Sequence, residues 1–447
     1  MAVNIQAIKG TQDTLPKDSY KLRFIEQTIA EIAGNYGFSE IRTPVFEYTD
    51  LFCRSVGDTT DVVQKEMYTF EDKGGRSITL RPEGTAGAMR SFLEHGLFNE
   101  AMPQKVYYFT SCYRYEKPQA GRLREFHQFG VECFGTESPA ADAEIIALAS
   151  EVFGFLGIQD LSLELNSIGC PTCRAQYHKA LKAYFESKKA DLCGTCLERL
   201  DRNPMRILDC KSPVCSEIAK DAPTVLDYIC DDCKTHFESV KKYLTAMNID
   251  YKINPTIVRG LDYYTRTVFE FVSTQIGAQG TVLGGGRYDG LAEELGGART
   301  PSLGFAMGME RLMMLLDAQK IELPSDNKCD LYIAPACEEA SFLAAQIAND
   351  LRSEGVFVLF DVVGRSIKAQ MKYANKIGAQ FTIVLGEDEM KSGMAKIKNT
   401  DSGEIQEIEV SSIADKFASI AIQSAVNSLT DESLDGIDLN ALLGGSI

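Results

Sequence analysis

Hydrophobic residues recur along this chain with two different spacings, and each spacing predicts a different kind of element. Within residues 19–36, the apolar residues Leu22, Ile25, Ile29 and Ile32 fall three or four positions apart, which predicts an amphipathic helix. Elsewhere apolar and polar residues alternate, which predicts half-buried strands. The chain therefore combines helices with strands.

Alternation is longest in residues 105–135, where it continues on both sides of a break at Pro118 and Gly121. This pattern predicts a long antiparallel hairpin with a basic loop. Residues 38–52 are also strand-like, but Pro44 within them cannot donate a ladder hydrogen bond. We therefore expect an edge or interface strand at this position.

Glycine and proline punctuate several other segments. Residues 78–97 predict a strand, a turn at Pro82–Gly84 and a helix. The segment LGGGRYDGL is expected to form a glycine-rich turn. Residues 302–316 predict a strand that leads into a helix with Arg311 near its start.

Composition and pattern divide the chain into parts. Residues 170–246 hold eight of the thirteen cysteines and have a helical pattern, which predicts an inserted subdomain. Strands and helices alternate from residue 330 onward, which predicts a small α/β domain followed by an acidic tail. The predicted parts are a main domain in two pieces (1–168 and 251–325), the cysteine-rich insertion (169–250), the C-terminal domain (328–422) and the tail (423–447).

The overall composition is that of an ordinary globular protein, with 45% hydrophobic and 24% charged residues. No stretch approaches about 18 uninterrupted apolar residues, so we expect no membrane span. The N-terminus lacks the pattern of a signal peptide, so we expect a cytoplasmic protein. The net charge of −17 excludes binding to DNA through bulk charge, and a nucleic-acid partner must meet a local basic surface.

The usual phosphate-binding loops are missing, since the sequence contains neither GxxxxGK[ST] nor a dinucleotide-binding fingerprint. Several arginines instead stand beside Gly, Pro or aromatic residues at element boundaries. Any one of them alone fits a solvated strand end, but guanidinium groups suit multi-oxygen anions and a dispersed set can hold ATP. The set that predicts a shared phosphate site is Arg81, Arg114, Arg122, Arg259, Arg287 and Arg311.

Three glutamates accompany these arginines. They are Glu83 in RPEGT, Glu116 in YRYEK and Glu132 in FGVECFG. Carboxylates at such a site can hold Mg²⁺, an amino group or an imidazole N–H. Taken singly, each is better explained as a solvated or ion-paired side chain.

Six segments in a fixed order resemble those of one family. They are YGFSEIRTPVFE, LRPEGT, YRYEKPQAGRLREFHQFGVECFG, VRGLDYYTRTVFEF, LGGGRYDGL and GFAMGMERL. The series resembles the histidyl-tRNA synthetases, a class II aminoacyl-tRNA synthetase family, over residues 1 to about 420. This resemblance implies an α+β catalytic domain with an antiparallel sheet, a small helical cysteine-rich insertion and a C-terminal α/β anticodon-binding domain. It also implies a homodimer whose interface includes the first segment.

The resemblance implies ATP-dependent ligation of L-histidine to its tRNA through a histidyl-adenylate, with Mg²⁺ accompanying ATP. Arg114 then holds the α-phosphate, with Glu116 near the adenine. Arg122 and Arg311 face the outer phosphates. Arg259 bridges the histidine carboxylate and the α-phosphate, so Arg259 and Arg114 are the implied catalytic residues.

The resemblance also implies a histidine pocket. Its implied residues are Glu83, Gly84, Thr85, Gln128, Glu132, Arg259, Tyr263, Tyr264 and Tyr288. Glu83, Thr85 and Gln128 are expected around the α-amino group, and Glu132 and the tyrosines beside the imidazole. A neutral imidazole offers one donor and one acceptor, so a carboxylate and a phenol can satisfy both.

A basic stripe stands out in the C-terminal domain. Arg365, Lys368, Lys372 and Lys376 recur at spacings of three and four, which places them on one helix face. A solvated charged face is the default explanation for such a stripe. Because phosphate contacts dominate affinity for RNA, the stripe is also a candidate tRNA contact.

The cysteines of the insertion allow two explanations. Three CxxC pairs are present, with Cys210 and Cys215 between the last two: Cys170 and Cys173, Cys193 and Cys196, and Cys230 and Cys233. Clustered thiolates are what four-coordinate zinc requires, and eight could fill one or two sites, with the three CxxC pairs as the candidate ligands. Buried cysteines can equally serve as small apolar packing groups. The family resemblance neither requires nor forbids zinc.

Two rival functions remain open for this fold. One is a synthetase-like regulatory subunit of histidine biosynthesis, which has no aminoacylation activity, and the other is a different ATP-dependent acyl-adenylate ligase. The chain retains Arg114, Arg259, Arg311 and a complete C-terminal domain, which favours the synthetase.

Overall fold

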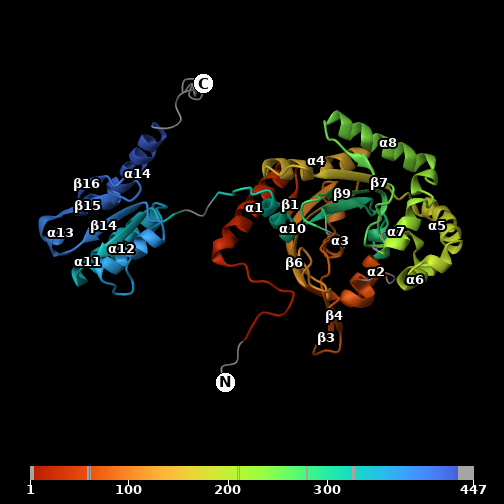
Figure 1. Ribbon diagram of the computed structural model, residues 1–447, viewed down its shortest axis with the longest axis horizontal. Coiled ribbons are helices and arrows are strands. Elements are labelled where there is room, and N and C mark those ends of the chain that lie inside the picture. Colours follow the sequence, from red (N-terminus) through yellow and green to blue (C-terminus); the bar gives the residue numbers. More distant parts are fainter. Residues whose placement is uncertain are drawn as a thin grey trace. The chain divides into compact units, whose positions relative to one another are not determined.

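The protein forms two compact units, Met1–Leu323 and Pro324–Ile447 (Figure 1). This computed structural model describes residues 5–57, 60, 62–208, 210, 212–277, 280–324 and 328–430. Each unit contains its own sheet, with helices packed against it.

An eight-stranded sheet organises the first unit, with the strand order β1-β5-β6-β11-β10-β9-β7-β8. All neighbouring pairs are antiparallel except β1 with β5 and β7 with β8. The antiparallel sheet implied by the family resemblance is therefore confirmed. Its strands are β1 (Ser39–Glu40), β5 (Gln104–Tyr113), β6 (Glu125–Phe134), β7 (Ser162–Ser167), β8 (Lys252–Ile253), β9 (Thr265–Val272), β10 (Thr281–Arg287) and β11 (Ser302–Gly308).

Four helices pack in the main hydrophobic core against one face of this sheet, and the opposite face combines polar residues with a second hydrophobic core. The four helices are α1 (Pro16–Asn35), α4 (Pro139–Phe155), α8 (Asp231–Ala246) and α10 (Met309–Ala318). In β6, Phe129, Val131 and Cys133 belong to the core beneath these helices. Side chains alternate along a strand, so Gln128 and Glu132 point to the opposite face.

The other helices and strands of the first unit frame that opposite face. A small antiparallel sheet, β2-β4-β3, precedes α3, and helices α5 to α7 gather beside the large sheet (Figure 1). These elements are β2 (Phe46–Tyr48), α2 (Thr49–Val56), β3 (Thr69–Glu71), β4 (Ser77–Leu80), α3 (Thr85–Glu94), α5 (Pro171–Glu186), α6 (Gly194–Arg202), α7 (Pro213–Lys220) and α9 (Leu291–Glu294). Single helical turns occur at Val62–Glu66, Leu97–Asn99, Lys189–Asp191, Pro204–Ile207 and Val225–Asp227.

Most local predictions are confirmed, but two are wrong. Residues 38–52 form two short strands, β1 and β2, which are both edge strands as predicted, but Pro44 lies between them rather than inside a strand. The glycines of LGGGR lie in strand β10 rather than in a turn. A side chain at Gly284 would collide with the guanidinium group of Arg259, so this glycine permits a close approach across the sheet.

The second unit has a five-stranded sheet of order β13-β12-β14-β15-β16, in which β12 runs parallel to both of its neighbours. This confirms the predicted small α/β domain. Its elements are β12 (Leu331–Pro335), α11 (Glu338–Ser353), β13 (Val358–Phe360), α12 (Ile367–Lys376), β14 (Phe381–Leu385), α13 (Glu387–Ser392), β15 (Met394–Asn399), β16 (Ile405–Glu409), a turn at Val410–Ser412 and α14 (Ile413–Thr430). Helix α14 thus passes residue 423, where the tail was predicted to begin, and residues 431–447 lie outside the described residues.

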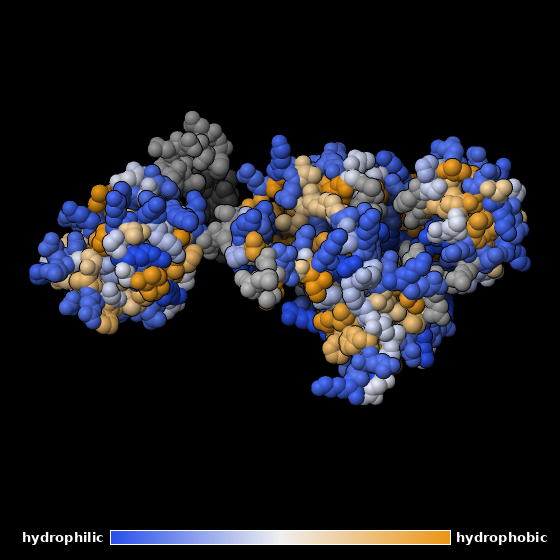
Figure 2. Space-filling model, turned by 60° about the horizontal axis from the view of Figure 1, so that its bottom comes forward, coloured by the Kyte–Doolittle hydropathy of each residue, from blue (hydrophilic) through white to orange (hydrophobic). Residues whose placement is uncertain are grey.

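The molecular surface is mainly hydrophilic on the face shown in Figure 2, with hydrophobic residues scattered across it. Among the described residues, no helix is long and apolar enough to cross a membrane. Exposed apolar side chains include Val45, Phe46 and Tyr48 in and beside strand β2, with exposed fractions of 41%, 57% and 56%.

Candidate active site

A polar cavity of about 300 Å³ lies against the sheet face opposite to α1, α4, α8 and α10. Strands β9, β10 and β11, the β5–β6 hairpin, the start of α3, the start of α10 and the loop before β9 all contribute to it. Predicted site residues that line this single cavity are Glu83, Thr85, Arg114, Glu116, Arg122, Gln128, Arg259, Tyr263, Tyr264, Tyr288 and Arg311.

Arginines from distant parts of the sequence meet in this cavity. Arg114 follows β5, donates from Nε to the carbonyl of Pro82 at 2.9 Å, and stacks over the ring of Phe126. Arg311, in the first turn of α10, donates to the carbonyls of Gly121 and Thr281 at 3.1 and 2.6 Å. These backbone contacts fix the guanidinium groups before any ligand binds, because rotamer freedom is already lost.

The guanidinium group of Arg311 lies close to two other guanidinium groups, and its pKa reflects this. Burial lowers the pKa of Arg311, and the neighbouring guanidinium groups of Arg122 and Arg114 lower it further. Arg122 forms an ion pair with Glu116, so part of the charge is compensated. This end of the cavity therefore favours an anion with several charged oxygens.

Arg259 lies in the loop before β9, and its guanidinium group is only partly compensated. It forms an ion pair with Glu270, whose other oxygen accepts a hydrogen bond from Thr281 Oγ1 at 2.9 Å. The guanidinium carbon lies 5.6 Å from the ring centre of Tyr264. Within the described residues, the buried Nε of Arg259 has no hydrogen-bond partner, so it remains available to a ligand.

The opposite end of the cavity is built from carboxyl and phenol groups. The buried carboxylate of Glu83 accepts hydrogen bonds from the backbone N–H groups of Thr85 and Ala86, at 2.9 and 2.7 Å, in the first turn of α3. Tyr263 donates its hydroxyl to the same carboxylate at 3.4 Å. Burial raises the pKa of Glu83 above its ordinary value. This carboxylate is positioned to accept a further donor such as an amino group.

Glu132 lies one contact behind the cavity wall rather than in it. Tyr288, which lines the cavity, donates its hydroxyl to Glu132, and Tyr108 donates from the other side at 2.8 Å. Burial raises the pKa of Glu132 to about 8. A side chain at Gly304, across the sheet on β11, would collide with the Glu132 carboxyl group, so glycine at this position makes room for it.

Three tyrosine rings pack together around this end. The ring centres of Tyr263 and Tyr264 lie 4.8 Å apart, and those of Tyr263 and Tyr288 lie 5.5 Å apart. Gln128 closes the wall and accepts a weak hydrogen bond from Cys112 Sγ at 3.3 Å. Such a slot, with fixed polar tips on apolar rings, suits a flat polar ring.

Comparison with known proteins decides the family. A family model described as "Histidyl-tRNA synthetase" matches residues 10–312, and one described as "Anticodon binding domain" matches residues 330–420. A protein of Acetivibrio thermocellus named "Histidine--tRNA ligase" is 54% identical over 92% of this chain and 99% of its own length. The chain belongs to the histidyl-tRNA synthetase family.

Solved structures agree with this assignment. The apo histidyl-tRNA synthetase of S. aureus is similar over 92% of this chain and 99% of its own, with a TM-score of 0.79 and 40% identity. A Bacillus halodurans protein titled as an ATP phosphoribosyltransferase regulatory subunit/histidyl-tRNA synthetase matches with a TM-score of 0.63 but only 22% identity, so it shows the fold alone. Sequence identity therefore favours a histidyl-tRNA synthetase over the regulatory-subunit alternative.

Three further residues of the synthetase at the cavity were not predicted from the sequence. Tyr108 supports Glu132 from behind, and its ring packs where side chains at Gly84 and Gly130 would otherwise stand. The alternation in β5 places Tyr108 on the cavity side, a signal that was present. Phe126 and Glu270 lack such a signal, because their roles depend on where Arg114 and Arg259 fold back. Gly84, predicted as a histidine ligand, packs beside the Tyr108 ring and does not line the cavity.

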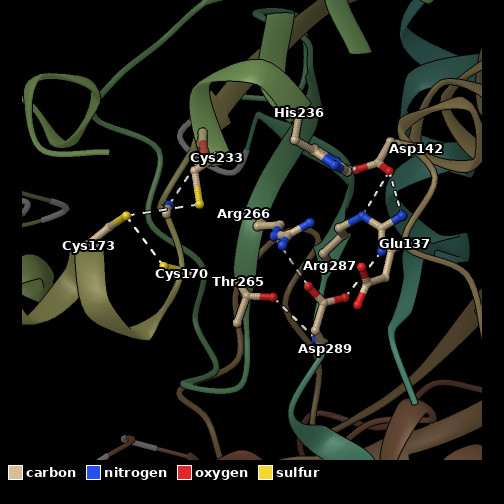
Figure 3. A network of polar contacts seen from close by, with 12 residues as sticks. Glu137, Asp142, Cys170, Cys173, Cys233, His236, Thr265, Arg266, Arg287 and Asp289 are labelled. Carbon is tan, nitrogen blue, oxygen red and sulfur yellow. Dashed lines mark hydrogen bonds and ion pairs between the residues drawn. The ribbon is translucent and has the colours of Figure 1, made fainter. Parts of the chain in front are cut away.

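Two arginines predicted for the phosphate site lie elsewhere in the synthetase. Arg81 is buried and donates to the backbone carbonyls of Ser111 and Thr43, at 2.6 and 2.9 Å. Arg287 is fully buried within the ion-pair network of Figure 3. The prediction is wrong for both, because position at an element boundary does not tell which way a side chain points.

The network around Arg287 joins three elements of the synthetase core. Arg287, at the end of β10, donates from Nε to Asp142 of α4 at 2.9 Å and pairs with Asp289 at 3.2 Å. His236 of α8 lies 3.3 Å from the other oxygen of Asp142 (Figure 3). Burial alone would raise the pKa of Asp142, but Arg287 and His236 outweigh it and the pKa is lowered.

The four basic residues of the C-terminal stripe have two different kinds of surroundings. Lys368, Lys372 and Lys376 are exposed on α12. Arg365 precedes the helix, pairs with Asp361 at 2.7 Å and packs over the ring of Tyr373. Arg365 therefore has a structural partner, whereas the three lysines face solvent.

Proposed function

We propose that the cavity forms histidyl-adenylate from L-histidine and ATP and that the enzyme then transfers the histidyl group to tRNA. One observation carries this proposal. Four arginines, Arg114, Arg122, Arg259 and Arg311, line the same cavity as a carboxyl- and phenol-lined slot. The first group suits a triphosphate and the second suits histidine.

In the activation step, an oxygen of the histidine carboxylate attacks the α-phosphorus of ATP and pyrophosphate leaves. No protein nucleophile or base is required. Arg114 and Arg259 neutralise the charge that develops on the α-phosphate, and the free Nε–H of Arg259 supports contact with the histidine carboxylate. Catalysis then depends on positioning and on charge stabilisation by groups fixed beforehand.

The outer phosphates and Mg²⁺ are assigned to the arginine end. Arg122 and Arg311 face the β- and γ-phosphates. Glu116 lies beside Arg122, and we assign it to the adenine side of the nucleotide. The carboxylates of Glu116, Glu270 and Glu310 line the cavity and have the oxygen ligands that Mg²⁺ prefers. Bound Mg²⁺ would neutralise charge on the outer phosphates.

Histidine is recognised at the other end. Glu83, Thr85 and Gln128 bind its α-amino group, and the Tyr288–Glu132 pair and Tyr264 bind the imidazole. An amino acid without two ring nitrogens would leave buried polar partners unsatisfied, which is costly. The slot therefore selects histidine by its hydrogen-bonding pattern as well as by its shape.

The transfer step requires tRNA, for which the C-terminal domain supplies the exposed lysines of α12. A hydroxyl of the terminal ribose attacks the carbonyl carbon of the adenylate, and AMP leaves. We assign Lys368, Lys372 and Lys376 to contacts with tRNA phosphates. Contacts with the charged phosphate groups dominate the affinity of proteins for RNA. Because ATP and tRNA are substrates of protein synthesis, we expect the enzyme in the cytoplasm.

We also propose a homodimer. Support comes from the exposed apolar side chains Val45, Phe46 and Tyr48, which lie in and beside β2 and belong to the first family segment and its continuation. Exposed apolar groups of this size that lie together are typical of protein interfaces. Sedimentation of the full chain tests this, and a species of one chain mass at micromolar concentration would contradict it.

The decisive experiment for the activity is ATP–pyrophosphate exchange with each amino acid in turn. We expect exchange that depends on histidine and on no other amino acid, together with charging of histidine tRNA. Exchange with another amino acid alone would favour a different acyl-adenylate ligase. No exchange by folded enzyme with any amino acid would favour the regulatory-subunit function.

A further inference from the structure

The eight cysteines of the insertion gather in two groups that the proposed reaction does not use. Among the described residues, one group is Cys170, Cys173, Cys230 and Cys233, and the other is Cys193, Cys196, Cys210 and Cys215. Within each group all four sulfur atoms lie within 4.8 Å of one another. The CxxC spacing alone identified three pairs, whereas the fold joins the first pair to the last and adds Cys210 and Cys215 to the middle pair.

Sulfur–sulfur distances in these groups match a metal site rather than disulfides. Zinc–sulfur bonds of about 2.3 Å in a tetrahedron place the sulfur atoms about 3.8 Å apart. The observed distances are 3.5 Å for Cys170–Cys173, 4.0 Å for Cys173–Cys233 and 3.8 Å for Cys193–Cys210. A disulfide requires about 2.05 Å, and all of these cysteines are free.

Backbone N–H groups also point at the sulfur atoms. The N–H of Cys230 donates to Cys173 Sγ at 3.1 Å, and the N–H of Cys193 donates to Cys215 Sγ at 3.2 Å. The N–H of Ser212 donates to Cys210 Sγ at 3.4 Å. Such donors stabilise a thiolate more than a thiol. Cysteines that served only as apolar packing groups would need neither these donors nor a fourfold convergence.

Helix ends add to the same effect. Cys170, Cys193 and Cys230 are the N-cap residues of α5, α6 and α8. The positive end of a helix dipole favours negative charge at its N-terminus. Thiolate charge in both groups is therefore supported from several directions, which is what a dication with four thiolate ligands requires.

We propose that each group binds one zinc ion, so that the full chain holds two tetrathiolate zinc sites. A closed set of four sulfur ligands is typical of structural zinc sites, and it leaves no position for substrate. The first site joins the start of α5, at the beginning of the insertion, to the start of α8, its last helix (Figure 3 shows Cys170, Cys173 and Cys233). It therefore holds the first and last helices of the insertion together.

The second site has a connection to the cavity. It closes the segment between Cys193 and Cys215, and two side chains of that segment contact the loop that carries Arg259. Asn203 Nδ2 donates to Asp262 Oδ1 at 3.1 Å, and Arg206 donates to the carbonyl of Gly260 at 2.9 Å. Zinc at this site therefore positions the loop of Arg259, a consequence that depends on the proposed function, whereas zinc binding itself does not.

Metal analysis of untagged full-length enzyme, purified without chelators, tests the proposal directly. We expect two zinc ions per chain, one in Cys173→Ser, one in Cys196→Ser and none in the double variant. Cys337→Ser, which changes a cysteine of the C-terminal domain, is the matched control and keeps two. Wild-type enzyme with one zinc or none, or with iron in place of zinc, would overturn the proposal.

Two further measurements keep the test independent of folding and of activity. Wild-type enzyme exchanged with Co²⁺ should show the visible absorption and sulfur-to-metal charge transfer of tetrahedral tetrathiolate cobalt, and octahedral spectra would count against the sites. The histidine-dependent exchange rate should fall several-fold in Cys196→Ser and stay unchanged in Cys337→Ser. If zinc is lost from Cys196→Ser and the rate is unchanged, the link to the Arg259 loop fails while the zinc sites stand.

Discussion

Buried arginines have opposite surroundings in two regions of this enzyme. Arg287 is fully buried, and its guanidinium group meets Asp142, Asp289 and two backbone carbonyls. In the cavity, Arg311 lies beside Arg114 and Arg122, and burial together with this proximity lowers its pKa. The first region pairs its guanidinium group with carboxylates, and the second brings three guanidinium groups together, which favours the binding of an anion with several charged oxygens.

This difference separates structural from functional arginines. A buried ion pair that is fully hydrogen-bonded tolerates no change of partner, because either member alone is left charged in a medium of low dielectric. A group of like charges costs free energy in the empty protein and is retained where a ligand compensates it. The substitutions below either change one side of this comparison or provide a reference outside it.

The largest expected effect comes from Arg259→His. This change removes the charged donor that we propose for the reacting phosphate, so we expect histidine-dependent ATP–pyrophosphate exchange to fall about 100- to 1000-fold. The melting temperature should stay close to that of the wild type, because Arg259 is only partly compensated. Arg299→His, at an exposed ion pair with Glu137, is the matched control and should keep full exchange. Near-normal exchange in Arg259→His would reject its catalytic role.

Arg287→Met acts on the other side, with an effect on stability. Asp142 would remain buried with His236 as its neighbour, and the expected loss in the free energy of unfolding is about 3–5 kcal/mol. Denaturant titration measures it. The double variant Arg287→Met/Asp142→Leu should recover most of the loss, since it removes both charges. A loss of about 1 kcal/mol or less, as for an exposed ion pair, would show that the network contributes little.

The buried carboxyl groups of Glu132 and Asp142 have pKa shifts of opposite direction. Asp142 has an arginine partner and a lowered pKa, whereas Glu132 has no ion pair in the described part of the chain and burial raises its pKa from 4.5 to about 8. Between these pH values the folded enzyme holds a proton that the unfolded chain has released, so this group lowers folding stability as pH rises from about 4.5 to 8.

The variant Glu132→Gln should remove that pH dependence. Its melting temperature without ligands should gain on the wild type as pH rises from about 6 to about 8, while its KM for histidine increases at every pH. Thermal scans across pH and exchange kinetics measure the two effects. A melting-temperature difference that is constant with pH would mean that Glu132 is ionised throughout this range.

The smallest effect is expected from exposed charge that belongs to neither region. Lys368→Glu, Lys372→Glu and Lys376→Glu together should weaken tRNA binding and reduce its salt dependence, by about one unit of slope for each lysine that binds a phosphate. Amino-acid activation should not change. Lys391→Glu, an exposed lysine on α13, is the control. An unaltered salt dependence of aminoacylation would remove these lysines from the tRNA surface.

Much of this enzyme could be predicted from its sequence, because alternation and helical spacing reflect burial. The β5–β6 hairpin and the strand leading to Arg311 are of this kind. What could not be predicted depends on contacts between distant segments. Arg287 looked like Arg259 at an element boundary, and only the position of Asp142 distinguishes them.

The grouping of the cysteines also depends on contacts between distant segments. Spacing revealed the CxxC pairs, but not that the pair at 170 meets the pair at 230 across the insertion. The role of glycine in β10 was equally hidden, since a turn and a close packing of backbone against a guanidinium group use the same residue.

The central claim is that the cavity arginines act on one triphosphate beside bound histidine. A crystal structure with histidinol and a non-hydrolysable ATP analogue tests it most directly. We predict that Arg114, Arg259 and Arg311 each donate hydrogen bonds to the phosphates of one nucleotide, with the imidazole against Tyr264 and Tyr288. A nucleotide bound elsewhere, or contacted by none of these three arginines, would contradict the claim.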